Sequence, residues 1–358
     1  QRLIARALGA WTYARVLAAC HPLNVASEHV LRDKLQMQFE GEVEPRPGFR
    51  RRVYSATRWM GERVTGGVAA LALTLATAVL TSFCGADSKA DPRLQAAVRL
   101  YVFDCGTLER ADISRFRLKA EEVATIRMSV ACFLVVHPRG TLMWDVGAVP
   151  DTEWKPTGSA VLQRVVLPDS QQREVTMVKP LGEQLRDIGF SAGQITYVAL
   201  SHYHWDHTAN ANDFVSSTWL VRQVERDAMF AADRPALLLP ATYAALRGAR
   251  TVVIEGDEHD VFGDGSVILK LAPGHTPGHQ VLYVKLPQTG GVVLSGDLYH
   301  YPEERTLSRV PTFEFDPAQT AVARAAIDAF LQSRDAQLWI QHDFTANARL
   351  RKAPQYYQ

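Results

Sequence analysis

The sequence predicts an α/β fold, an αββα sandwich in which two mixed sheets pack face to face with helices outside. Short apolar runs typical of buried strands recur along most of the chain, and two helical segments interrupt them. The order is strands, a helix, more strands, a second helix and a last strand, which suits such a sandwich. The segment expected to fold this way is residues 91–358.

Each element is expected from a local pattern. Strands over residues 132–137 and 141–144 are joined by the hairpin turn Pro138-Arg139-Gly140. A helix over residues 178–188 stops at Gly189, and a long helix is expected over residues 317–333. The remaining strands are expected at residues 100–103, 195–200, 218–222, 251–254, 267–271, 280–286, 292–294 and 338–340.

A run of metal-ligating side chains follows the strand expected at residues 195–200. It reads His202-Tyr203-His204-Trp205-Asp206-His207, which places four candidate ligands within six positions. Because side chains alternate along an extended chain, His202 and His204 would point the same way at the strand end. Asp206 and His207 come next and can face a second ion. A single histidine is usually structural, but this spacing indicates a metal site.

Further candidate ligands lie downstream, each after an apolar run. His275 lies in the turn-rich segment Gly274-His275-Thr276-Pro277-Gly278-His279, Asp297 follows the strand at residues 292–294, and His342 follows the strand at 338–340. Strand tips at one sheet edge can converge. Five histidines and two aspartates suit a pair of borderline ions such as zinc.

The order His-x-His-x-Asp-His, Gly-His-Thr-Pro-Gly-His, Ser-Gly-Asp and a late histidine resembles the metallo-β-lactamase superfamily. Within it, residues 98–357 are most similar to the N-acyl homoserine lactonases, the quorum-quenching lactone hydrolases. Residues 100–106 (LYVFDCG) and 297–302 (DLYHYP) carry this likeness to the lactonases. The resemblance implies the metallo-β-lactamase fold and a metal-dependent hydrolase that acts on a small-molecule lactone.

The resemblance also implies a centre of two zinc ions, for which Co²⁺ or Mn²⁺ can substitute. One ion would be held by three histidines and the other by two histidines and an aspartate. Asp297 would bridge the two ions together with a water or hydroxide. The implied ligands are His202, His204 and His275 for the first ion, and Asp206, His207 and His342 for the second.

The implied reaction opens the lactone ring of N-acyl homoserine lactones. A metal-bridging hydroxide would attack the carbonyl carbon, and an ion or Asp206 would stabilise or protonate the leaving ring oxygen. Similar lactonases use a tyrosine shortly after the bridging aspartate to contact the substrate carbonyl. Tyr299 is the candidate here, and His300 is the alternative in register.

Two other residues have expected supporting roles. Asp145 resembles the aspartate of the superfamily's first motif, which forms hydrogen bonds to the metal-binding loop without binding the metal itself. The alternative role for Asp145 is that of an ordinary aspartate in a turn. His279 lies four residues after His275 and is expected to form hydrogen bonds within its loop and not to bind metal.

Several alternative functions share these residues. A thioesterase of the glyoxalase II type, or another ester or organophosphate hydrolase, would use a similar ligand set. A protein of another class, which binds metal without hydrolytic activity, would be expected to lack some ligands, and all seven are present. True β-lactamases of the superfamily carry a cysteine near the bridging position, where this chain has Asp297.

Charge argues against a nucleic-acid partner. The chain of 358 residues has a net charge of +1, but residues 1–59 carry 10 Lys+Arg against 5 Asp+Glu, whereas residues 91–358 carry 27 against 31. The expected catalytic segment is therefore mildly acidic and has no basic field for nucleic acid. The oligomeric state stays open, with a homodimer as one candidate.

The first 90 residues are expected to lie outside the enzyme domain. Residues 1–59 are interpreted as a non-native or disordered extension, and residues 60–90 as a signal peptide beginning at Met60. The apolar run at 68–83 is shorter than the ~20 residues of a membrane span and suits a signal core, with cleavage after Ala90. The chain is thus expected to be exported, without stable membrane insertion. A lipoprotein signal at Cys84 is disfavoured because Phe83 is bulky.

Only Cys105 and Cys132 would remain after cleavage. Two cysteines in a large domain do not form a disulfide framework. They would form one disulfide bond in an oxidising compartment or stay as buried thiols, and the proposed ligands require neither.

Overall fold

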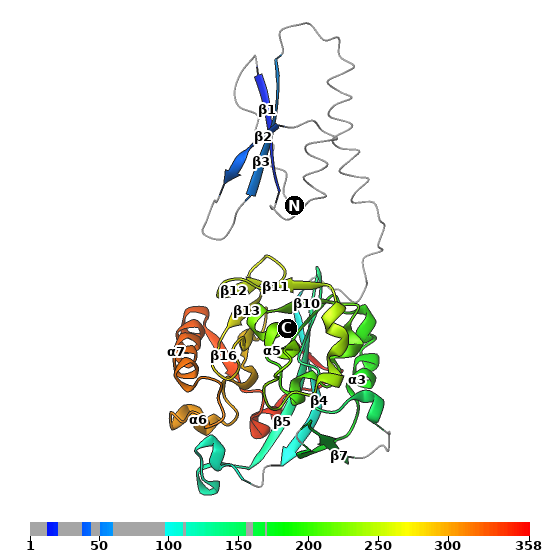
Figure 1. Ribbon diagram of the computed structural model, residues 1–358, viewed down its shortest axis with the longest axis vertical. Helices are drawn as coiled ribbons and strands as arrows, with labels where there is room; N and C mark the ends of the chain where they lie inside the picture. The colour runs from blue at the N-terminus through cyan, green and yellow to red at the C-terminus, as the bar shows by residue number, and fades with distance from the viewer. Residues whose placement is uncertain are drawn as a thin grey trace. The chain divides into compact units, whose positions relative to one another are not determined.

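The computed structural model describes residues 97–109, 112–154, 160–168 and 170–358, together with the backbone of three strands nearer the N-terminus. The chain divides into two units, Gln1–Lys89 and Ala90–Gln358 (Figure 1). The start expected for the enzyme domain, near residue 91, stays a prediction. The expected signal segment at residues 60–90 lies outside the described residues.

The first unit contains a small antiparallel sheet. Its strands are β1 (Tyr13–Cys20), β2 (Gln38–Val43) and β3 (Arg51–Trp59), in the order β1-β3-β2. These strands differ from the disordered alternative expected for residues 1–59. Strand propensity in the sequence could have indicated these strands, since Val53, Tyr54 and Thr57 of β3 are residue types enriched in strands. The other alternative, a mis-assigned start, stays a prediction.

The second unit begins with a large mixed sheet in the order β11-β10-β9-β6-β5-β4-β8-β7, with β17 paired to β4. Its strands are β4 (Arg99–Glu109), β5 (Arg127–His137), β6 (Gly140–Trp144), β7 (Val161–Val166), β8 (Gln172–Met177), β9 (Tyr197–Ala199), β10 (Thr218–Val221), β11 (Thr251–Val253) and β17 (Tyr356–Tyr357). The β7–β8 hairpin was not expected, because charged residues interrupt both strands.

A smaller mixed sheet packs against the large one (Figure 1). In order it contains β12 (Glu258–Asp260), β13 (Val267–Leu271), β14 (Gln280–Leu286), β15 (Gly290–Leu294) and β16 (Ala336–Trp339). Only the β15–β16 pair in this sheet is parallel. The two packed mixed sheets confirm the predicted αββα sandwich.

The described residues of this unit form six α-helices. They are α3 (Leu181–Asp187), α4 (Trp205–Thr208), α5 (Gln223–Phe230), α6 (Pro302–Thr306), α7 (Pro317–Arg334) and α8 (Phe344–Arg349). Helices α3 and α5 pack on the outer face of the large sheet and α7 on that of the small sheet. Short 3₁₀ turns occur at Ser114–Phe116, Ala120–Glu122, Asp151–Glu153, Ala192–Gln194, Ala211–Phe214, Pro240–Thr242, Ala244–Gly248 and Gly296–Leu298. The expected helix at residues 178–188 begins only at Leu181, after Pro180 at its N-cap.

The alternation of side chains along each strand separates the core into layers. In β5, Phe133 and Val135 join the core between the sheets, whereas Leu134 and Val136 join the core beneath α3 and α5. In the small sheet, neighbouring residues likewise face either the large sheet or α7. Burial on both faces explains why these strands read as continuous apolar runs.

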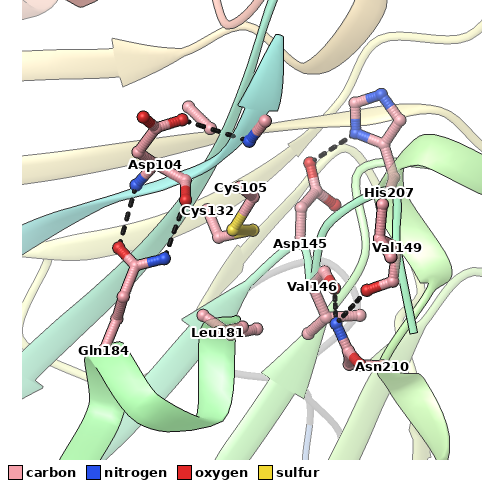
Figure 2. Close-up of a disulfide and its surroundings, with 12 residues drawn as sticks. Asp104, Cys105, Cys132, Asp145, Val146, Val149, Leu181, Gln184, His207 and Asn210 are labelled. Carbon is pink, nitrogen blue, oxygen red and sulfur yellow. Dashed lines mark hydrogen bonds and ion pairs between the residues drawn. A yellow bond between two sulfur atoms is a disulfide. The ribbon is translucent and has the colours of Figure 1, made fainter. Parts of the chain in front are cut away.

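A disulfide joins Cys105 of β4 to Cys132 of β5 (Figure 2). Both residues are buried, and the backbone of Gly147, just after Asp145, packs against them. Of the two alternatives for these cysteines, a disulfide bond and buried thiols, the structure has the disulfide bond. Among the described residues, none of the helices is long and apolar enough to cross a membrane.

Candidate metal centre

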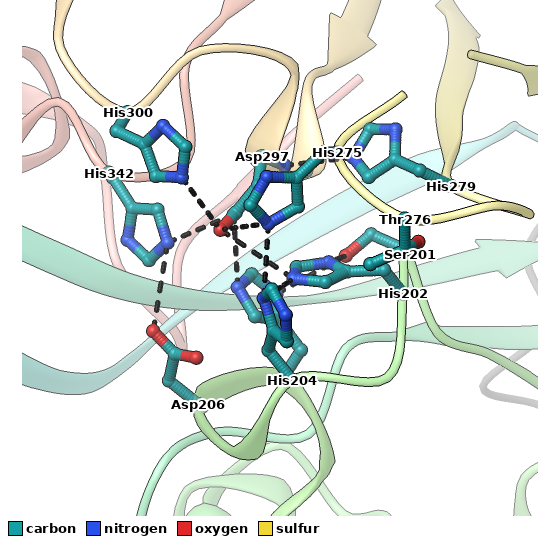
Figure 3. A network of polar contacts seen from close by, with 12 residues as sticks. Ser201, His202, His204, Asp206, His275, Thr276, His279, Asp297, His300 and His342 are labelled. Atoms are coloured by element: carbon teal, nitrogen blue, oxygen red, sulfur yellow. Dashed lines mark hydrogen bonds and ion pairs between the residues drawn. The ribbon is translucent and has the colours of Figure 1, made fainter. Parts of the chain in front are cut away.

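The candidate ligands follow the ends of strands, and Figure 3 shows their side chains turned towards Asp297. His202 and His204 follow β9, His275 follows β13, Asp297 follows β15 and His342 follows β16. In the small sheet, β13, β15 and β16 run in the same direction, so their carboxyl ends share an edge. The sheet topology therefore brings together residues that are up to 140 positions apart.

Asp297 is at the centre of the cluster, and its two carboxylate oxygens face different groups. Oδ1 lies 3.0 Å from Nε2 of His207 and 3.0 Å from Nε2 of His342. Oδ2 lies 3.3 Å from Nε2 of His275 and 3.6 Å from Nε2 of His202. This arrangement suits a carboxylate that bridges two ions.

The donor atoms gather into two buried groups. The atoms of each group lie within 4.8 Å of one another, and the groups are His202, His204, His275 and Asp297, and Asp206, His207 and His342. The structure thus brings together all seven predicted ligands. Asp206 is at the margin, with Oδ2 3.8 Å from Nε2 of His342.

The cluster fits metal ions better than it fits hydrogen bonding alone. Nε2 of His207 and Nε2 of His342 both lie 3.0 Å from Asp297 Oδ1, yet none of these three buried atoms has a hydrogen bond of good geometry among the described residues. Nδ1 of His204 faces two other ring nitrogens, His202 Nε2 at 2.9 Å and His275 Nε2 at 3.0 Å. Buried polar atoms without partners are costly, and converging imidazole nitrogens are what a divalent ion binds.

The electrostatics set up competition between protons and metal. Burial lowers the pKa of His202 and of His204 well below the usual value, so these rings are neutral. Burial also opposes the charged form of His207, but the carboxylates of Asp297 and Asp145 outweigh it and raise the pKa of His207 well above the usual value. Because a ligating imidazole must be unprotonated, a metal ion would displace this proton.

Asp145 lies behind His207, as the sequence indicated. Its Oδ2 lies 2.8 Å from His207 Nδ1 and accepts a hydrogen bond of 2.7 Å from Gln341 Nε2, while Oδ1 accepts one of 2.6 Å from the backbone of Ser201. Asp145 has a positive φ of 54°, a conformation that aspartate tolerates better than most residues. It connects the segment that carries His202 and His207 with Gln341, the neighbour of His342.

His279 is bound within its loop and lies outside both groups. Its Nδ1 donates to the carbonyl of Ala272 at 2.8 Å, and its Nε2 accepts from the backbone N–H of Asp297 at 3.0 Å. Gly296 makes this approach feasible, because a Cβ there would lie 2.7 Å from His279 Nε2 and φ is +50°. His279 thereby fixes the backbone that presents Asp297.

Sequence reasoning missed three buried glutamates, Glu225, Glu304 and Glu314, of which Glu225 and Glu314 support the loops of the candidate ligands. Oε1 of Glu314 lies 2.9 Å from Nδ1 of His275. Glu225 of α5 accepts hydrogen bonds from the backbones of Tyr203 and Gly278, at 2.9 and 2.8 Å, and so joins two ligand loops. Both lie far along the chain from the ligands they support, and no local motif marks them.

The structure corrects the role expected for Tyr299. Its backbone is extended, with φ −142° and ψ 139°, so Tyr299 and His300 point in opposite directions. The ring of Tyr299 packs in the core beneath α7, where the guanidinium of Arg324 lies 4.1 Å from its centre. His300 lines the cavity over the metal centre. The proposed contact of Tyr299 with substrate is therefore wrong.

A cavity opens directly over the metal centre. Its apolar lining comes from Phe116, Met128, Trp205, Leu237 and Phe313, and its polar lining includes Asp206, Asp297, His300 and His342. Two arginines, Arg115 and Arg173, also line it. Phe116 and Trp205 of this lining also belong to the adjoining hydrophobic core, together with Tyr203 and Trp154.

Comparisons with known proteins agree with this geometry. The chain is 27% identical over 276 residues to the N-acyl homoserine lactonase AttM of Agrobacterium fabrum. The matched region covers 73% of this chain and 98% of the relative. The chain is also 24% identical over 237 residues to the N-acyl homoserine lactonase AiiA of Bacillus thuringiensis subsp. kurstaki. That matched region covers 64% of this chain and 88% of the relative.

Solved structures share the fold. One is an N-acyl homoserine lactone hydrolase with the product N-hexanoyl-L-homoserine at its catalytic metal centre, with a TM-score of 0.60, 21% identity, and coverage of 73% of this chain and 100% of that one. Another is AidC, a dizinc quorum-quenching lactonase, with a TM-score of 0.53, 18% identity, and coverage of 74% and 94%.

The family model of the metallo-beta-lactamase superfamily matches residues 125–338, which contain six of the seven ligands and end just before His342. This match, the packed sheets and the two groups of donor atoms agree. The chain belongs to the metallo-beta-lactamase superfamily.

Proposed function

We propose that the chain is a lactonase that opens the ring of N-acyl homoserine lactones at a centre of two metal ions. The observation that carries the proposal is the position of Asp297, whose two oxygens face separate groups of donor atoms on the floor of a cavity. The similarity to proteins named N-acyl homoserine lactonases supports the substrate class.

The seven predicted ligands would hold the two ions, with Asp297 shared. Ions bound there would lower the pKa of water towards about 7 and polarise a carbonyl group. Imidazole and carboxylate donors suit zinc, and they also accept cobalt or manganese. Asp145, Glu314 and Glu304 would hold His207, His275 and His300 in position through their other ring nitrogens.

The residues of the chain itself would bind the substrate and handle its proton. Phe116, Met128 and Phe313 offer an apolar wall for an acyl chain beside the ligands. Asp206 lines the same cavity, where it can hold the proton that the leaving ring oxygen takes up. Water adds across the acyl carbon–oxygen bond, so the products are one carboxyl and one hydroxyl group on the same molecule. The new carboxyl group ionises well below pH 7 and releases its proton.

A pH-indicator assay on metal-loaded protein tests the proposal. We expect proton release with N-acyl homoserine lactones, loss of activity with a chelator, and recovery with zinc, cobalt or manganese. Because the chemistry that such ions would supply suits many carbonyl compounds, the cavity walls must select the substrate. Efficient cleavage of S-lactoylglutathione without lactone hydrolysis would overturn the proposal in favour of the glyoxalase-type thioesterase, and cleavage of other esters or organophosphates alone would favour that alternative.

A further inference from the structure

We infer that His300 is an eighth metal-binding side chain of this centre, and that it belongs to the ion held by His202, His204 and His275. The inference rests on the proposed two-metal centre and adds a donor to it. Its grounds are where Nε2 of His300 lies, what holds Nδ1, and how the ring faces the other ligands.

The first observation is the distance of His300 from the bridging carboxylate. Its Nε2 lies 3.2 Å from Oδ2 of Asp297, the same oxygen that faces His275 at 3.3 Å and His202 at 3.6 Å (Figure 3). His300 is 3% exposed, yet it lines the cavity. Its nitrogen thus lies at least as close to Oδ2 as those of two assigned ligands.

The second observation is the support of the other ring nitrogen. Nδ1 of His300 lies 3.2 Å from Oε1 of Glu304, which is completely buried and accepts a hydrogen bond of 2.6 Å from Arg324. His207 with Asp145 and His275 with Glu314 are built in the same way, at 2.8 and 2.9 Å. A carboxylate on the outer nitrogen is typical of a ligating histidine, because it orients the ring and makes it a better donor.

His279 shows what a buried histidine of this cluster looks like when it does not ligate. Its Nε2 already accepts a hydrogen bond from the backbone of Asp297, and its Nδ1 reaches a carbonyl. Neither nitrogen is left for an ion. In His300 the outer nitrogen is held by a carboxylate and the inner one points to the centre.

The third observation assigns the ion. The rings of His300 and His275 have centroids 5.0 Å apart, closer than the 5.9 Å between His300 and His342. Nε2 of His300 faces Oδ2 of Asp297, the oxygen on the side of His275 and His202. The first ion would then have the imidazoles of His202, His204, His275 and His300 and one oxygen of Asp297. This is one donor more than a tetrahedral zinc ion takes, so the position favours an ion that accepts five or more ligands.

Metal binding by a His300→Gln variant tests the inference, with Tyr299→Phe as the matched control because the neighbouring side chain points away from the centre. Titration against a competing chelator should show that H300Q loses at least about tenfold in affinity for one ion. Its cobalt form should absorb more strongly in the visible range, because fewer ligands remain. Affinity and spectrum equal to those of the unchanged protein would overturn the inference, even if activity fell.

A second measurement does not depend on the folding of a variant. In a crystal structure of the unchanged protein loaded with metal, Nε2 of His300 should lie about 2.1 Å from an ion. A separation above about 3 Å, with two ions bound to the other seven side chains, would overturn the inference and leave the proposed function intact. Fewer than two bound ions would instead overturn the metal centre, and the inference with it.

Discussion

His207 and Asp145 form a buried pair in which Nδ1 lies 2.8 Å from Oδ2, although 62 residues separate them in the sequence. Asp145 also accepts hydrogen bonds from the backbone of Ser201 and from Gln341, so one carboxylate connects the segments that carry His202, His207 and His342. A single aspartate thereby orients a candidate ligand and holds two ligand segments together, residues 201–207 and 341–342.

Replacing Asp145 with Asn should weaken metal binding more than it changes the fold. The amide can keep a hydrogen bond to Ser201, but it removes the negative charge opposite His207. We expect the affinity for the ion held by His207 to fall by about 10- to 100-fold, as measured by chelator competition.

A matched control exists for this substitution. His137 and Asp264 form a second pair at 2.9 Å, in another part of the fold. Asp264→Asn should leave metal affinity unchanged. Equal losses in both variants would show that a general loss of stability, not ligand orientation, causes the effect.

Asp297→Ala should lower the binding of both ions, because each oxygen faces one group of ligands. Elemental analysis should find metal falling from about two ions per chain to well below two. Unchanged metal content in Asp297→Ala would contradict the bridging role.

His279→Ala should keep both ions and lower the free energy of unfolding by about 1–3 kcal/mol, since the N–H of Asp297 and the carbonyl of Ala272 lose their partner.

Glu225 should make stability depend on pH. Burial raises its pKa from 4.5 to about 7, against hydrogen bonds that favour the charged form. Because the folded state holds this proton more tightly than the unfolded state, the stabilisation is complete below pH 4.5 and is lost as pH rises to about 7.

Urea unfolding of the unchanged protein and of Glu225→Gln, both without metal, measures this dependence. Between pH 4.5 and about 7, the free energy of unfolding of the unchanged protein should fall relative to that of Glu225→Gln as the pH rises. Curves that stay parallel from pH 4.5 to 8 would show that Glu225 does not titrate there.

We also propose export, with cleavage after Ala90. Mature protein recovered from the native host should begin near Asp91 and lie outside the cytoplasm, because residues 68–83 have the length and apolar character of a signal core. N-terminal sequencing decides it. A stable product that retains residues before Met60 would contradict both the export and the mis-assigned start.

The candidate ligands could be named from the sequence because their chemistry is local. The spacing of His202, His204, Asp206 and His207 within one turn after a strand fixes their mutual directions, whatever surrounds them. Asp297 and His342 were found in the same way, since each follows a strand whose apolar residues mark it as buried. The apolar runs likewise predicted two packed sheets.

Only the tertiary structure decided what surrounds those ligands. Glu314 meets His275 across 39 residues, and Glu225 meets Tyr203 across 22, so no spacing in the sequence predicts either contact. The choice between Tyr299 and His300 depended on the backbone angles after Gly296, which turn neighbouring side chains to opposite sides. Local pattern determines which residues can bind metal, whereas packing between distant segments determines which of their nitrogen and oxygen atoms converge at the candidate centre.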